Sequence, residues 1–141
     1  MWRVTVLVIR LKDGRVRVID YKTGKDELSL ESISSLFARE GKRNKAAFQT
    51  ILYSWLYAQN EKNSGPIVPM LMNRKNLFKE EGLKTFSMAR QGISDIRPNL
   101  PEFEKRLQTL LEDLFNPDIL FTQTRDESNC KFCLYKNMCR R

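Results

Sequence analysis

The stretch Val18-Ile19-Asp20-Tyr21-Lys22-Thr23-Gly24 is an apolar strand that ends in an acid and a lysine two residues apart. Side chains alternate along a strand, so Asp20 and Lys22 project from the same face, about 6–7 Å apart along the chain. A carboxylate at this place can hold a hard divalent cation, and a neighbouring ammonium can polarise an attacking water or stabilise an anion. Taken alone, the pair also fits the solvated end of a strand with a loose ion pair.

This strand is predicted to be the second arm of a hairpin that begins an α/β fold. Residues 2–11 are apolar on both alternating sets, which is typical of a strand covered on both faces of a sheet. Asp13-Gly14 predicts a two-residue turn, and that turn pairs Leu7 with Asp20. Because no acidic residue precedes Lys12, no other register places a second carboxylate opposite Asp20.

The spacing of apolar residues predicts the elements that follow. Residues 30–37 have helical spacing, with Gly41 as a stop, and a second helix is expected over residues 44–59. In that second helix Gln49 and Tyr53 lie four residues apart, on one face. The remaining expectations are a strand at 67–72, a strand near Thr85-Phe86 within the irregular segment 73–98, an amphipathic helix from Pro101 to Asn116, and an irregular cysteine-bearing tail over 116–141. The predicted apolar stripes are Phe48, Ile51, Leu52, Trp55 and Leu56 in one helix, and Phe103, Leu107, Leu110, Leu111 and Leu114 in the other.

Composition indicates a single folded domain over residues 1–141, with 41% hydrophobic and 30% charged residues. No apolar run approaches the length of a membrane span, so we expect a cytoplasmic protein that does not bind membranes. The 25 basic and 17 acidic residues give a net charge of +8, which favours polyanionic partners. The cluster Lys42-Arg43-Lys45 is predicted to contact phosphates, with a merely solvated basic face as the alternative. Absence of histidine excludes Ser-His and Cys-His nucleophilic pairs and His-containing zinc motifs from this sequence.

Three cysteines close the sequence in the pattern Cys130-x-x-Cys133-x5-Cys139. An odd number argues against a disulfide framework, and in a cytoplasmic protein this spacing indicates metal binding. Iron–sulfur clusters and many structural zinc sites take four thiolates, one more than the sequence contains. The alternative is three reduced thiols in a loose tail.

In their order along the chain, Asp20-Tyr21-Lys22-Thr23-Gly24, Gln49-x-x-x-Tyr53 and the terminal cysteines resemble the nuclease domain of RecB-like and AddB-like exonucleases. These enzymes belong to the PD-(D/E)XK superfamily, and the closer subgroup carries an iron–sulfur cluster. The resemblance runs from about Gly14 to the C-terminus. It implies a restriction-endonuclease-like fold, a central mixed β-sheet flanked by helices, truncated at the N-terminus. The implied function is a metal-dependent DNA exonuclease module acting in recombination and repair.

The resemblance also implies roles for individual residues. Asp20 and the backbone carbonyl of Tyr21 would bind Mg²⁺ or Mn²⁺, and Lys22 would position or activate the hydrolytic water. Gln49 would lie beside that lysine, and Tyr53 would contact DNA. The three cysteines, Cys130, Cys133 and Cys139, match the last three of four ligands of a 4Fe-4S cluster, which is therefore incomplete in this sequence.

The sequence departs from the family pattern on the N-terminal side of Asp20. Leu7 is expected where the family has a second metal-binding aspartate, and the upstream histidine and first cysteine have no counterpart. We therefore expect the chain to be the C-terminal part of a larger nuclease, with a helicase subunit or domain as its partner. Two alternatives differ in class: a catalytically inactive nuclease fold that binds DNA or a helicase partner, and a zinc-stapled protein-interaction domain.

Overall fold

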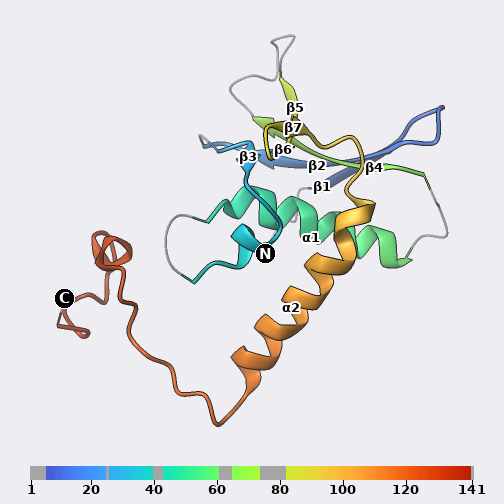
Figure 1. The fold of residues 1–141 in the computed structure, drawn as a ribbon. Coiled ribbons are helices and arrows are strands. Elements are labelled where there is room, and N and C mark those ends of the chain that lie inside the picture. Colours follow the sequence, from blue (N-terminus) through green and yellow to red (C-terminus); the bar gives the residue numbers. More distant parts are fainter. Residues whose placement is uncertain (1–5, 25, 40–42, 61–64, 74–81, 141) are drawn as a thin grey trace.

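The structure is a computed structural model that describes residues 6–24, 26–39, 43–60, 65–73 and 82–140. Its centre is a four-stranded mixed sheet in the order β1-β2-β4-β5 (Figure 1). The strands are β1 (Val6–Arg10), β2 (Val16–Lys22), β4 (Ile67–Asn73) and β5 (Leu83–Thr85). Strands β2 and β4 are parallel, whereas β1 and β5 are antiparallel to their neighbours. This confirms the predicted α/β class with a central mixed sheet, and β4 confirms the strand predicted at 67–72.

Helix α1 (Lys45–Asn60) connects the two parallel strands and packs against one face of the sheet. The helix was predicted within one residue at each end, but its buried side differs from the predicted stripe. Leu56 is 44% exposed, while Thr50 and Ser54 are fully buried. Both hydroxyls donate 2.9 Å hydrogen bonds to the carbonyl four residues earlier, so these small side chains are satisfied inside the core. Small buried residues let the helix approach the sheet closely.

The β1–β2 hairpin has a loop one residue longer than predicted. Leu11 and Arg15 close the loop through a 2.8 Å backbone hydrogen bond, and Gly14 adopts a φ of +84°. A three-residue loop with glycine in this left-handed conformation shifts the pairing by one residue relative to a two-residue turn. Val6, not Leu7, therefore lies opposite Asp20, and the predicted register was wrong. Arg15 donates a 2.8 Å side-chain hydrogen bond to Asp13, which lowers the pKa of that carboxyl.

Two further predictions in the N-terminal half were wrong. Strand β1 is an edge strand in which Leu7 and Val8 are each 39% exposed, so it is not covered on both faces; residues 1–5 lie outside the described residues. The helix expected over 30–37 is a short strand followed by one 3₁₀ turn, β3 (Ser29–Leu30) and η1 (Ser34–Phe37). Its apolar residues are nevertheless buried, because a turn at the same spacing points Ile33 and Leu36 into the core.

The segment after β5 forms a small second sheet and leads into α2. Strands β6 (Ser87–Met88) and β7 (Gln91–Gly92) pair with each other, and β6 also pairs with β3. Two 3₁₀ segments, η3 (Arg97–Asn99) and η4 (Glu127–Cys130), flank the second helix and its tail. Helix α2 (Leu100–Phe115) confirms the helix predicted from Pro101 to Asn116.

The first turns of α2 supply its contacts with the hydrophobic core of the domain. Leu100 and Phe103 are buried, whereas the later stripe residues Leu110, Leu111 and Leu114 are 36–51% exposed. The outer half of the helix projects away from the sheet, and the chain after it runs outward as an irregular tail (Figure 1). None of the helices in the described ranges is long and apolar enough to span a membrane.

Candidate active site

Asp20 and Lys22 lie at the end of β2 on the face that α1 covers. Asp20 is 4% exposed, and its Oδ2 lies 2.9 Å from the Nζ atom of Lys22. This is an ion-pair distance, yet Oδ2 is buried without a hydrogen-bond partner of proper geometry. Burial of a carboxylate is costly unless a cation lies close to it. The strand alternation predicted from sequence therefore places the acid and the ammonium together, and the ammonium offsets part of the cost.

Gln49 and Tyr53 of α1 extend this pair into a chain of four side chains. Lys22 Nζ donates a short hydrogen bond to Gln49 Oε1. Gln49 Nε2 in turn donates a 2.6 Å hydrogen bond to the hydroxyl of Tyr53 one helical turn further on. The structure thus brings Asp20, Lys22, Gln49 and Tyr53 together, in that order, across the junction of β2 and α1. The ammonium of Lys22 is therefore held by both the Asp20 carboxylate and the Gln49 amide oxygen.

Two asparagines that the sequence analysis did not single out hold this junction in place. Asn44 accepts a 2.9 Å hydrogen bond from the backbone N–H of Ala47, which caps the start of α1. Its amide donates to the carbonyls of Glu27 and Ser29, at 2.8 and 2.9 Å, tying the helix to the preceding segment. Asn73, at the end of β4, donates to the Gly24 carbonyl just beyond Lys22. An asparagine directly before a helical run was the available sequence signal for Asn44.

The position opposite Asp20 holds an apolar side chain. Val6 is the cross-strand partner on β1, and Leu71 is the neighbour on β4. The described part of β1 therefore contributes no second carboxylate opposite Asp20. The residue at this position is Val6, whereas Leu7 was predicted there. In the described ranges, no three histidine, cysteine, aspartate or glutamate side chains lie close enough to hold a metal ion.

A divalent cation nevertheless fits Asp20 in a limited way. The buried Oδ2 has no hydrogen-bond partner, so it retains a lone pair for a ligand. Magnesium is commonly held by only one or two carboxylates, with water and substrate phosphate oxygens supplying the rest. The donor set is therefore that of a cation shared with a phosphate substrate, and it is too small for a site built from protein atoms alone. Because Nζ of Lys22 covers Oδ2, the ammonium must shift for a cation to reach that oxygen.

The remaining predicted site residues lie apart from this junction. Tyr21 is 36% exposed on the opposite face of β2. Arg43 and Lys45 are exposed next to the start of α1, and Lys42 lies outside the described residues. Cys130, Cys133 and Cys139 are free thiols in the tail. The backbone N–H of Cys133 donates a 3.1 Å hydrogen bond to the carbonyl of Cys130, which closes a turn between them. The four-residue chain at β2 and α1 is thus the part of the prediction that the fold assembles.

A family comparison identifies the kind of protein that carries this arrangement. The model of the PD-(D/E)XK nuclease superfamily matches residues 7–140. The match covers nearly the whole chain, from β1 to the end of the tail. The chain belongs to the PD-(D/E)XK nuclease superfamily. No curated protein and no solved structure matches it in the corresponding comparisons.

Proposed function

We propose that the chain is a metal-dependent deoxyribonuclease module of the RecB/AddB-like kind, with Asp20, Lys22, Gln49 and Tyr53 as its working residues. The hydrogen-bonded chain from Asp20 to Tyr53 is the observation that carries this proposal. It joins a carboxylate, an ammonium and a phenol at one strand end, a set of groups suited to hydrolysis of a phosphodiester. Membership of the nuclease superfamily supports the reaction class.

In the proposed mechanism each side chain has a role set by its surroundings. Asp20 and the Tyr21 carbonyl would hold a Mg²⁺ or Mn²⁺ ion, which when bound neutralises charge developing on the phosphate. Lys22, released from Asp20, would direct its ammonium toward the attacking water or the phosphate oxygens. Gln49 keeps that ammonium at the strand end through the hydrogen bond already present. Tyr53 presents its hydroxyl beside Gln49, where a DNA strand would pass.

The second candidate is an inactive nuclease fold that binds DNA or a helicase partner. Val6 opposite Asp20 is the observation that favours it, because a single carboxylate leaves the cation dependent on the substrate.

We expect Mn²⁺-dependent degradation of linear DNA by the protein and loss of that degradation in Lys22→Ala. Gel analysis of a labelled duplex measures both. No cleavage by the unaltered protein would favour the inactive fold, while equal cleavage by both proteins would remove Lys22 from the mechanism.

We also propose that the three cysteines supply part of a 4Fe-4S site, with the fourth ligand and a helicase partner outside residues 1–141, which form one nuclease-like domain. Three thiols within ten residues, in a tail with little packing of its own, support a metal as the organising element. Iron and acid-labile sulfide should accompany the protein when it is purified without oxygen. Zinc in stoichiometric amount, without iron, would support a zinc-stapled tail instead.

A further inference from the structure

A cavity of about 520 Å³ lies between α2 and the segment from η1 to the start of α1. Its volume is in the range of pockets that hold small ligands or single nucleotides. Four cations line it, Arg39 and Arg43 on one side and Lys105 and Arg106 of α2 on the other. The two carboxylates in its wall, Glu102 and Asp113, leave an excess of two positive charges.

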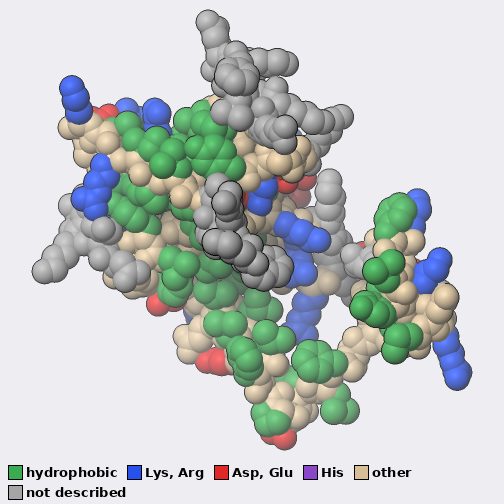
Figure 2. All heavy atoms as spheres, turned by 180° about the vertical axis from the view of Figure 1, so that it is seen from behind, with side chains coloured by type: hydrophobic (Ala, Val, Ile, Leu, Met, Phe, Trp, Pro, Cys, Tyr) green, Lys and Arg blue, Asp and Glu red, His purple; other side chains and the backbone are tan. Residues whose placement is uncertain are grey.

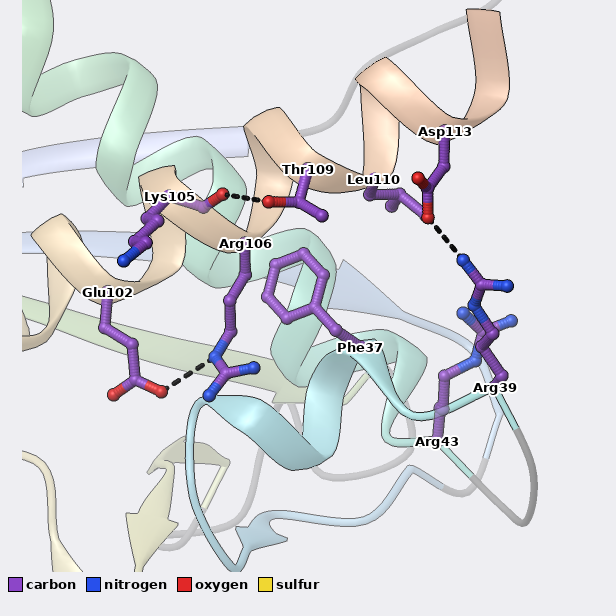
Figure 3. Close-up of a pocket in the computed structure, with 9 residues that line it drawn as sticks. All are labelled: Phe37, Arg39, Arg43, Glu102, Lys105, Arg106, Thr109, Leu110 and Asp113. Carbon is purple, nitrogen blue, oxygen red and sulfur yellow. Dashed lines mark hydrogen bonds and ion pairs between the residues drawn. The ribbon is translucent and has the colours of Figure 1, made fainter. Parts of the chain in front are cut away.

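The ion pairs within this cavity occupy only two of the four cations. Arg106 lies 2.8 Å from Glu102, and Arg39 pairs with Asp113 across the two elements (Figure 3). For Arg43 and Lys105 no ion pair exists within the described part of the chain. Cations held near one another without matching carboxylates favour an anionic ligand. The cavity is therefore suited to phosphate groups.

An aromatic ring lies between the two groups of cations. Phe37 is flanked by Arg106 on one side and by Arg39 and Arg43 on the other (Figure 3). The centroid of its ring lies 5.3 Å from the ring centroids of both Phe48 of α1 and Phe103 of α2. These two contacts hold the Phe37 ring in place. Rigid aromatic surfaces between cations are what proteins use to bind single-stranded nucleic acid, with bases on the ring and phosphates on the cations.

Phe37 also connects the cavity to α1, the helix that carries Gln49. Phe48 packs under Phe37, and the next residue, Gln49, holds the ammonium of Lys22. A column of Lys and Arg side chains faces the recess between the body and the tail (Figure 2). Arg43 lies next to the start of α1 and lines the cavity, so a strand that leaves the active site past this end of the helix would meet that cation.

We propose that this cavity, the Phe37 pocket, binds one strand of DNA, with phosphates at Arg43 and Lys105 and a base against Phe37. The proposal rests on the proposed nuclease function for the identity of the strand. The Phe37 pocket would hold the unpaired strand next to the site of cleavage. Helix α2 would thus have a role in binding substrate that the sequence motifs did not indicate.

The test is binding of a fluorescein-labelled 12-nucleotide single strand, followed by anisotropy in EDTA so that cleavage cannot contribute. Lys105→Gln and Arg43→Gln should each weaken binding roughly three- to tenfold near 0.1 M salt. Each should also reduce the slope of log affinity against log salt by about 0.7, the value for one phosphate that is no longer neutralised. Both residues are exposed, so the fold should persist. Lys12→Gln, in the exposed hairpin loop, removes the same charge elsewhere and should change the affinity less than twofold.

Three results would overturn the proposal. Pocket variants that bind like Lys12→Gln would show that the strand does not use the Phe37 pocket, and absence of binding by the unaltered protein would do the same. Displacement of the oligonucleotide by inorganic phosphate or by an acidic peptide at equal concentration would assign the pocket to a free anion or to a protein. None of these results bears on the Mn²⁺-dependent cleavage assay, so the nuclease proposal stands or falls separately.

Discussion

Asp20→Asn is expected to reduce metal-dependent DNA cleavage by about 10³-fold or more while leaving the fold intact. The substitution keeps the shape of the side chain but removes the charge that would hold the cation. Stabilisation of transition-state charge by a metal is worth several kcal/mol, and each 1.4 kcal/mol corresponds to a factor of about ten in rate. Initial rates on linear DNA in Mn²⁺ would measure the loss.

The stability of this variant should change little, because two opposing effects act at Asp20. The substitution removes the ion pair with Lys22, but it also removes the cost of a buried carboxylate whose Oδ2 has no hydrogen-bond partner. Only one member of the pair is removed, but the Lys22 side chain that remains is 23% exposed and keeps its hydrogen bond to Gln49, so its ammonium is not left buried and unpaired. We therefore expect a change of about 1 kcal/mol or less, as for a partly exposed ion pair. A site that gains nothing in stability from its charge is typical of a functional position.

Glu31→Gln provides the matched control, since it neutralises an exposed carboxylate elsewhere in the same domain. It should retain full activity and an unchanged unfolding midpoint. Undiminished cleavage by Asp20→Asn would contradict the proposed role of Asp20 and would direct attention to a different acidic residue. If Asp20→Asn abolished both cleavage and cooperative unfolding, the carboxylate would instead be needed for the fold.

Local residue patterns were enough to predict the strand end and the helix beside it. Alternation fixes the common face of Asp20 and Lys22, and four-residue spacing fixes that of Gln49 and Tyr53. That the two pairs join through a lysine–glutamine hydrogen bond depends on how α1 crosses from β2 to β4. The resemblance supplied this expectation, and periodicity alone could not.

The predicted and observed structures differ where a single residue's conformation or a distant interaction decides the structure. Asp-Gly favours a two-residue turn, but Gly14 in a left-handed conformation closes a three-residue loop and shifts the register. Helical spacing over 30–37 is satisfied by one 3₁₀ turn. The segment before it is tied to the start of α1 by hydrogen bonds from Asn44 to the carbonyls of Glu27 and Ser29, which no local pattern indicates. The Phe37 pocket was not predicted, since Phe37 and Lys105 are brought together only by tertiary packing.

Phe103→Ala is expected to destabilise the protein by about 3–5 kcal/mol, the usual cost of removing a buried phenylalanine. Phe103 is fully buried, and its ring centroid lies 5.3 Å from that of Phe37 and 5.5 Å from that of Phe48. The Phe103 ring therefore packs α2 against both η1 and α1. Because Leu100 is the other buried residue of α2, loss of Phe103 removes most of what anchors this helix. Urea denaturation followed by circular dichroism would measure the change.

The same substitution separates the two proposed sites, the active site at Asp20 and the Phe37 pocket. Asp20, Lys22 and Gln49 lie on β2 and α1, whereas two thirds of the residues that line the Phe37 pocket come from α2. Loosening of α2 should therefore weaken strand binding more than it alters the arrangement at Asp20. Leu114→Ala, at a residue 51% exposed on the outer half of α2, should cost less than about 1 kcal/mol. Equal destabilisation by the two variants would show that the outer half of α2 packs against the domain after all, and that Phe103 is not its principal anchor.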